Sequence, residues 1–210
     1  EVTPVLHNWM TRFESLWKDF PEARAIYYVD GKPASVGTRI RNPAYAALLR
    51  DVAARGPDAF YSGANAKAIS DAVANAQRNK ATLTVKDVAA YKAKERPAAC
   101  TSYRIYKVCG MGPPSSGATT VLGILGMVEG WDMKAMGQDN PMSWHLLAEA
   151  MQLSYADRSA YLGDPDFVDV PVTGLLDKKY LAERRQLISP FGAAGRYEPG
   201  TPPGATPRAA

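Results

Sequence analysis

The sequence is poor in the residues that build metal sites and disulfide frameworks. It holds only two histidines, His7 and His145, and two cysteines, Cys100 and Cys109, among 210 residues. The two cysteines lack the spacing of zinc ligands, so we expect no metal site. We also expect no cofactor, and structural or solvated roles for both histidines.

Long apolar runs and strong charge of one sign are missing as well. The longest apolar stretch, near residues 121–128, is too short to span a bilayer. The net charge is +4, but the basic residues are scattered among acidic ones. This pattern favours a solvated surface over a nucleic-acid-binding one. We therefore expect no membrane span and no nucleic-acid partner. No signal segment follows Glu1, so we expect a processed or truncated start.

The composition is that of a globular protein with a change near the end. Hydrophobic residues make up 46% and charged residues 22% of the chain, close to the usual values for folded domains. Residues 189–210 are rich in proline and glycine and carry little apolar content. We expect one lobe over residues 1–188, followed by a flexible tail at 189–210 that packs poorly.

The pattern of apolar residues, prolines and capping residues predicts a helix-rich protein with a small antiparallel sheet. Asn42-Pro43 and Asn140-Pro141 are typical helix starts. Thr84 followed by Asp87 resembles a capping box. Helices are expected over 4–20, 43–55, 64–79, 84–93, 116–129, 141–162 and 175–187, with strands at 25–29 and a strand pair within 97–111.

The two cysteines have the right spacing to face one another in that strand pair. If the strands pair around a two-residue turn at Arg104-Ile105, then Cys100 is opposite Cys109 in a non-hydrogen-bonded position. Such positions place Cα atoms about 4.5 Å apart, within reach of a disulfide. Arg-Ile is a poor choice for a tight turn, and two buried free thiols are the alternative. A disulfide would indicate an oxidising compartment.

Several other residues could carry chemistry, but each has a simpler structural interpretation. Asp164, Asp166 and Asp169 follow a helix end, where carboxylates typically bind backbone amides rather than calcium. Thr119 and Thr120 lie inside an expected helix and have no free amine, so we interpret them as packing residues. The sequence has no Gly-x-Ser-x-Gly nucleophile motif.

The loop before residue 118 is the best candidate for a binding site. Pro113 and Pro114 stiffen it, and Ser115, Ser116 and Gly117 begin the next helix. Amide groups at a helix start can receive a carboxylate. The alternative is a simple helix cap with close packing at Gly117.

Five segments, in order, resemble the γ-glutamyltranspeptidase family. They are Gly56–Gly63 (GPDAFYSG), Leu83–Tyr91 (LTVKDVAAY), Ser102–Val108 (SYRIYKV), Met111–Gly117 (MGPPSSG) and Tyr155–Val168 (YADRSAYLGDPDFV). The last is the most specific. The chain departs from the family pattern at Ile105, Gly112 and Ala118.

The resemblance implies an α/β (α+β) fold that forms part of the αββα sandwich of N-terminal-nucleophile hydrolases. Such a precursor cuts itself into a large and a small subunit, and the small subunit then begins with the catalytic threonine. The chain resembles the back portion of the large subunit. Its expected partners are the small catalytic subunit, the N-terminal part of the large subunit and a small-molecule γ-glutamyl substrate.

The implied activity is acyl transfer by a γ-glutamyl transferase or hydrolase acting on glutathione-like compounds. We expect no catalytic residue in this chain, an inactive fragment by itself, and a tail that leads to the self-cleavage point. Alternatives are a cephalosporin or glutaryl acylase of the same family, or a non-catalytic scaffold fragment. The expected location is periplasmic or secreted.

Overall fold

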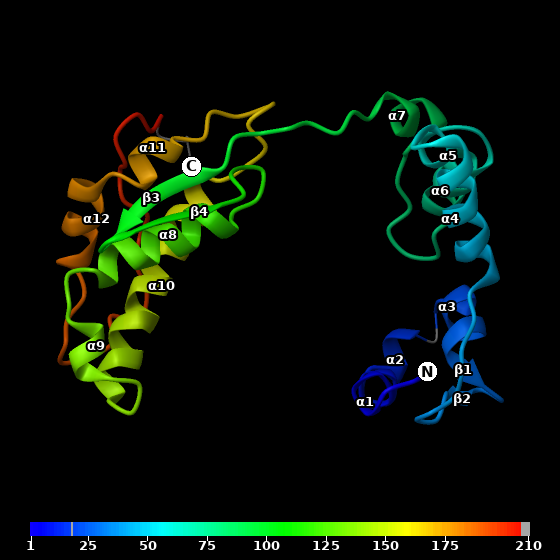
Figure 1. Ribbon diagram of the computed structural model, residues 1–210, viewed down its shortest axis with the longest axis horizontal. Helices are drawn as coiled ribbons and strands as arrows, with labels where there is room; N and C mark the ends of the chain where they lie inside the picture. Colours follow the sequence, from blue (N-terminus) through cyan, green and yellow to red (C-terminus); the bar gives the residue numbers. More distant parts are fainter. Residues whose placement is uncertain (18, 207–210) are drawn as a thin grey trace. The chain divides into compact units, whose positions relative to one another are not determined.

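The structure is a computed structural model that describes residues 1–17 and 19–206. The chain divides into two compact units, Glu1–Ala93 and the part from Lys94 onward (Figure 1). This differs from the expected single lobe over 1–188. The physical reason is that each unit has its own cluster of buried apolar side chains, and residues 91–98 form no helix or strand.

The first unit consists of short helices and one small sheet. Val2, Met10 and Ala34 form its buried apolar cluster. Strands β1 (Tyr28–Val29) and β2 (Lys32–Pro33) pair antiparallel. The helices are α1 (Pro4–Arg12), α2 (Glu14–Trp17), α3 (Pro21–Tyr27), α4 (Pro43–Arg55), α5 (Asp58–Tyr61), α6 (Gly63–Ala74) and α7 (Val85–Ala90).

Local capping explains where several of these helices begin. The side chain of Asn42 accepts a hydrogen bond from the Tyr45 amide at the start of α4. Thr84 and Asp87 form the reciprocal bonds of a capping box at the start of α7, so that prediction is confirmed.

Sequence predictions in the first unit are wrong in the boundaries of two helices and in the type of one element. The helix expected over 4–20 is divided into α1 and α2, with Phe13 as the C-cap of α1. The strand expected over 25–29 is mostly helix, because Pro21 occupies the first position of α3 and Glu, Ala and Arg follow it. These residue types favour helix more strongly than an isolated apolar run favours strand. The helix expected to reach residue 79 ends at Ala74.

The second unit is a hairpin and a helix bundle. Strands β3 (Ala99–Tyr103) and β4 (Tyr106–Gly110) pair with Cys100 opposite Cys109, which confirms the predicted register. The two cysteines form a disulfide with Cα atoms 4.1 Å apart. They are exposed, unlike the buried thiols of the alternative interpretation. The helices are α8 (Gly117–Val128), α9 (Met133–Met136), α10 (Pro141–Tyr161), α11 (Val172–Leu175) and α12 (Lys178–Arg185).

Helix α8 is the centre of this unit. It packs against α10, α12 and both strands of the hairpin, which lies along it in Figure 1. Gly123 and Gly126 make the close approaches possible, because a side chain at Gly126 would collide with Leu181 of α12. The main apolar cluster comprises Met127, Val128, Leu146, Ala150, Leu153, Tyr180, Leu181 and Ile188.

Part of the tail that was expected to pack poorly is instead bound to the bundle, although most of its described residues are exposed. Pro202 is fully buried, and the Gly200 amide donates to Asp157 of α10 at 2.8 Å. The expectation of poor packing is therefore corrected for residues 194–203, and residues 207–210 lie outside the described part. The physical reason is that backbone amides and carbonyls hold this segment, so a low apolar content does not prevent docking.

Candidate functional site

Two adjacent residues of α10 point in different directions and bind two different segments. Asp157 is 5% exposed and faces the interior of the bundle, whereas Arg158 is exposed. Neighbouring positions on a helix are rotated by about 100° relative to each other. The pair can therefore connect one segment on each side of the helix.

Arg158 binds the loop that the sequence singled out. Its Nε donates a hydrogen bond of 2.8 Å to Oγ of Ser116. The Arg158 guanidinium carbon lies 5.7 Å from the centre of the Tyr155 ring, which holds the side chain over the helix surface. The contact brings together two segments that are 42 residues apart in the sequence.

The loop differs in one respect from the simple cap considered above. Ser116 is the N-cap residue of α8, but its side chain makes no capping bond. Oγ of Ser115 instead accepts from the Gly117 amide at 3.3 Å. Both serines are half-buried and Gly117 is exposed. Ser116 is thus turned toward the Arg158 guanidinium, and the start of α8 combines a cation with the positive end of a helix.

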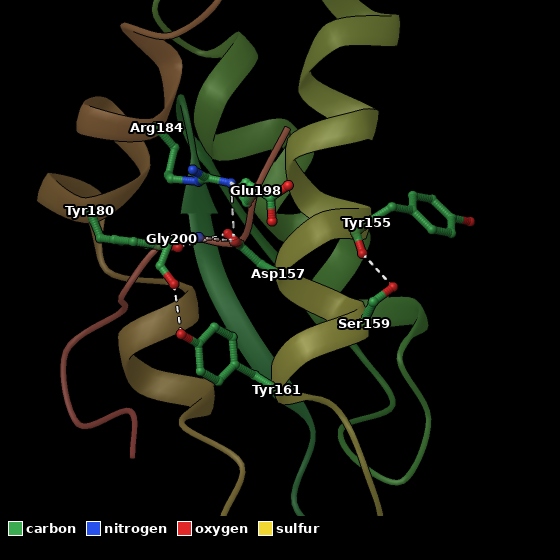
Figure 2. A network of polar contacts seen from close by, with 8 residues as sticks. All are labelled: Tyr155, Asp157, Ser159, Tyr161, Tyr180, Arg184, Glu198 and Gly200. Carbon is green, nitrogen blue, oxygen red and sulfur yellow. Dashed lines mark hydrogen bonds and ion pairs between the residues drawn. The ribbon is translucent and has the colours of Figure 1, made fainter. Parts of the chain in front are cut away.

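Asp157 is the centre of a buried network (Figure 2). Its Oδ2 accepts from the Tyr180 hydroxyl at 2.8 Å. Its Oδ1 accepts from Arg184 at 3.1 Å and from the Gly200 amide at 2.8 Å. Burial, and next the bond to Asp157, raise the pKa of Tyr180 above its usual range. Tyr180 therefore remains a neutral hydrogen-bond donor over the physiological pH range.

The aspartates after α10 are paired with cations from the start of the second unit. Asp166 accepts from Lys94 at 2.6 Å and from Arg96 at 2.9 Å. The Lys94 bond, and then the Arg96 bond, lower the pKa of Asp166. Oδ1 of Asp164 accepts from the Asp166 amide at 3.0 Å, as expected for a turn. These carboxylates are structural ion-pair and turn groups.

Both histidines have structural partners. Nδ1 of His7 lies 2.9 Å from the Ala34 carbonyl, and Nε2 of His145 lies 2.7 Å from that of Ser189. Thr119 and Thr120 are buried within α8. Within the described residues, no cluster of histidine, cysteine and carboxylate side chains could hold a metal ion. In the same part of the chain, every helix falls short of the length or apolar character needed to cross a bilayer.

Comparison with known proteins identifies the family. The sequence pattern that describes the gamma-glutamyltranspeptidase family matches residues 1–205. The chain belongs to the γ-glutamyltranspeptidase family.

Individual relatives agree with this assignment. The chain is 38% identical over 187 residues to the acylase ACY 1 proenzyme of Pseudomonas sp. (strain SE83), covering 89% of this chain. It is 41% identical over 158 residues to the glutathione hydrolase proenzyme of Escherichia coli (strain K12), covering 75% of this chain. It spans 33% and 27% of the lengths of these two relatives.

A solved structure supports the fold of this γ-glutamyltranspeptidase-family chain. The γ-glutamyltranspeptidase of Helicobacter pylori aligns with a TM-score of 0.84 and 30% identity, covering 95% of this chain and 57% of that one. The predicted fold class, a helix-rich part of the γ-glutamyltranspeptidase architecture with small antiparallel sheets, is therefore confirmed.

The structure also shows functional candidates that sequence reasoning missed. Asp157 and Arg158 were noted only as letters of the most specific motif, without separate roles. Tyr180, Arg184 and Gly200 were not singled out at all. A signal for Asp157 was present, because it continues the helical spacing of Leu146, Ala150 and Leu153, and a buried carboxylate requires a partner. Nothing in the sequence indicated which partner this would be.

Proposed function

We propose that this chain is a portion of the large subunit of a γ-glutamyl transferase or hydrolase that acts on glutathione-like compounds. The observation that carries the proposal is the family match over residues 1–205. The proenzyme names of its relatives support processing into subunits. The proposed partners are the small catalytic subunit of the same precursor, the N-terminal part of the large subunit and a small γ-glutamyl compound.

The chemistry we propose is acyl transfer through a threonine that lies outside this chain. Thr119 and Thr120 cannot serve as this nucleophile, because they are internal residues of α8 without a free amine. Residues 189–210 would lead to the self-cleavage point of the precursor. The chain itself would supply helices and one wall of the site.

The substrate-facing part of this wall would be Ser115, Ser116 and Gly117. Arg158 supports this role, since its guanidinium bonds Ser116 and adds positive charge beside the start of α8. A carboxylate of a γ-glutamyl compound is the chemical group that suits this surface. The exposed disulfide supports the proposed periplasmic or secreted location.

The second candidate is an acylase of the same family. It is favoured by the 38% identity to an acylase proenzyme. The two functions differ in whether the acyl donor carries an α-amino group, as a γ-glutamyl donor does and a glutaryl donor does not. A non-catalytic scaffold fragment is the third alternative, and the same test separates it from the two enzymes.

The test compares the full precursor and this fragment on a γ-glutamyl anilide and on the matching glutaryl anilide. We expect the precursor to process itself and then to turn over the γ-glutamyl substrate, and we expect no turnover by the fragment. Faster turnover of the glutaryl substrate would favour the acylase. Activity of the fragment alone would contradict the placement of the nucleophile outside it, and no activity in either would favour the scaffold.

A further inference from the structure

Helix α10 carries two buried carboxylates on one side. Glu149 is 1% exposed and Asp157 is 5% exposed. They are separated by little more than two helical turns, or about 12 Å along the axis. Burial of a carboxylate is costly unless strong hydrogen bonds compensate for the lost water. The groups that these two carboxylates bind therefore indicate their purpose.

Both carboxylates bind the same distant segment, residues 194–200. Glu149 accepts from the Ala194 amide at 3.3 Å and from the Tyr197 hydroxyl. Burial, and then the bond to Glu149, raise the pKa of Tyr197 to about 12, so its hydroxyl stays protonated at neutral pH. Asp157 accepts from the Gly200 amide at 2.8 Å. We call residues 194–203 the strap.

The strap is also bound through its carbonyl oxygens. The Tyr161 hydroxyl donates to the Gly200 carbonyl at 2.7 Å, and Arg184 donates to the Glu198 carbonyl at 2.9 Å (Figure 2). Gly200 is thus bound at its amide and at its carbonyl, which belong to the two successive peptide units that meet at its Cα. Because each of these two peptide units is held by a hydrogen bond, the strap is fixed in direction as well as in position at Gly200.

The fit around Gly200 leaves no room for a side chain. A Cβ at this position would collide with the Tyr180 hydroxyl and lie 2.9 Å from Cδ of Arg184. Further along the strap, Pro202 is fully buried, and a Cβ on Gly174 would collide with the Pro203 carbonyl. The strap is therefore held by polar bonds and close contacts with α10, α11 and α12.

We propose that Asp157, with Tyr161, Tyr180 and Arg184, is a positioning clamp that directs the strap toward the self-cleavage point of the precursor. The inference rests on the proposed function, in which residues 189–210 lead to that point. The clamp affects the cleavage rate by setting the position of the strap, and through it the approach of the peptide bond that is cut. An error of about 1 Å in the approach of a reacting peptide costs about a hundredfold in rate.

The experiment follows self-cleavage of the full-length precursor in three variants. Asp157→Asn removes the charge that binds Arg184, and Gly200→Ala forces the strap away from Tyr180 without altering any helix. Gly192→Ala is the matched control, because a Cβ there meets nothing within 4 Å. Hydrogen exchange of amides 194–200 reports release of the strap, and thermal unfolding reports folding of the bundle.

We expect Gly200→Ala and Asp157→Asn to accelerate exchange of the strap amides and to slow cleavage by about tenfold or more. Gly192→Ala should cleave at the wild-type rate. Substrate turnover per cleaved molecule should stay within about twofold of wild type. A general structural defect would lower this turnover as well as the cleavage rate. If Asp157→Asn does not fold, Gly200→Ala alone decides the question.

Three results would overturn the clamp. The first is cleavage at the wild-type rate in a variant whose strap amides exchange faster. The second is unchanged exchange of amides 194–200 in both clamp variants, and the third is a cleavage rate in Gly192→Ala that is lowered as much as in the clamp variants. Absence of cleavage in the wild-type precursor would instead contradict the proposed function. The two failures are therefore distinguishable.

Discussion

Glu129, at the C-cap of α8, shows how a single carboxylate connects elements of the second unit. It accepts a hydrogen bond of 2.6 Å from Nζ of Lys178 and a second from the Arg104 amide in the hairpin turn. Lys178 also donates to the Ser102 carbonyl of β3. The Lys178 bond, followed by the Arg104 bond, lowers the pKa of Glu129 below its usual 4.5.

We predict that Glu129→Gln lowers the free energy of unfolding by about 1 kcal/mol at neutral pH. A depressed pKa in the folded state means that the stabilisation is present above the unfolded-state pKa and is lost as pH falls through the folded-state pKa. The difference between wild type and variant should therefore shrink below pH 4.5. Urea unfolding of both proteins at neutral and acidic pH measures this difference in free energy of unfolding.

Glu183→Gln, at an exposed position of α12, is the control for this prediction. Its free energy of unfolding should differ little from that of wild type, and this small difference should not shrink at acidic pH. If the free energies of unfolding of wild type and Glu129→Gln differ by the same amount across the acidic range, the assigned role of the carboxylate is contradicted.

The bond between Arg158 and Ser116 permits a second prediction at the residue scale. Arg158→Ala and Ser116→Ala should each raise the KM for a γ-glutamyl anilide in the full-length enzyme by about tenfold. The double variant should be only slightly worse than either single one, because both remove the same contact. Ser159→Ala serves as the control, since its hydroxyl bonds only the Tyr155 carbonyl within α10 among the contacts observed.

A double-mutant cycle on KM provides the measurement. Fully additive effects would mean that Arg158 and Ser116 act independently, despite the 2.8 Å contact. Unchanged KM in all three variants would remove the start of α8 from the proposed substrate wall.

At the scale of elements, the approach of α12 to α8 depends on glycine. Gly126→Ala should lower the free energy of unfolding by about 1–3 kcal/mol, because the new methyl group collides with Leu181. Gly123→Ala should cost less, since its Cβ would lie 3.0 Å from Oγ of Ser154 and only in ordinary contact with Leu181, at 3.9 Å from Cδ2. Urea unfolding of the full-length protein gives both values.

The in-helix control for this series is Gly117→Ala. A Cβ at that position would make an ordinary contact with Oγ of Ser115 at 3.6 Å. Alanine also has the higher helix propensity, so this variant should be neutral or slightly more stable. If Gly117→Ala and Gly126→Ala lower the free energy of unfolding equally, close packing of α8 against α12 does not explain the loss of stability.

The elements also show which kinds of sequence signal are reliable. The capping box at Thr84 and the cysteine register of the hairpin were both predicted correctly, since each depends on residues within a few positions of one another. The division of the expected helix 4–20 at Phe13 was missed. A stripe of apolar residues does not reveal a break in a helix when the segments before and after the break are both helical.

At the scale of the whole molecule, the disulfide links the structure to the proposed location. We predict that protein isolated from its native compartment contains the Cys100–Cys109 bridge in full. Mass spectrometry of a tryptic digest without reduction should find the two cysteine peptides joined. The same protein made in a reducing cytosol should yield them separately, and free thiols in the native material would contradict the proposed periplasmic or secreted location.

Family membership, the helix-rich class, the cysteine register and the capped helix starts could all be inferred from the amino-acid sequence. All of these depend on residue identities at short spacing. The folded chain was needed to show that Arg158 binds Ser116 and that Asp157 binds Gly200, across 42 and 43 residues respectively. The physical reason lies in the partners. Asp157 binds a backbone amide of the strap, and backbone groups are the same at every position of a sequence, so no residue pattern could indicate this contact.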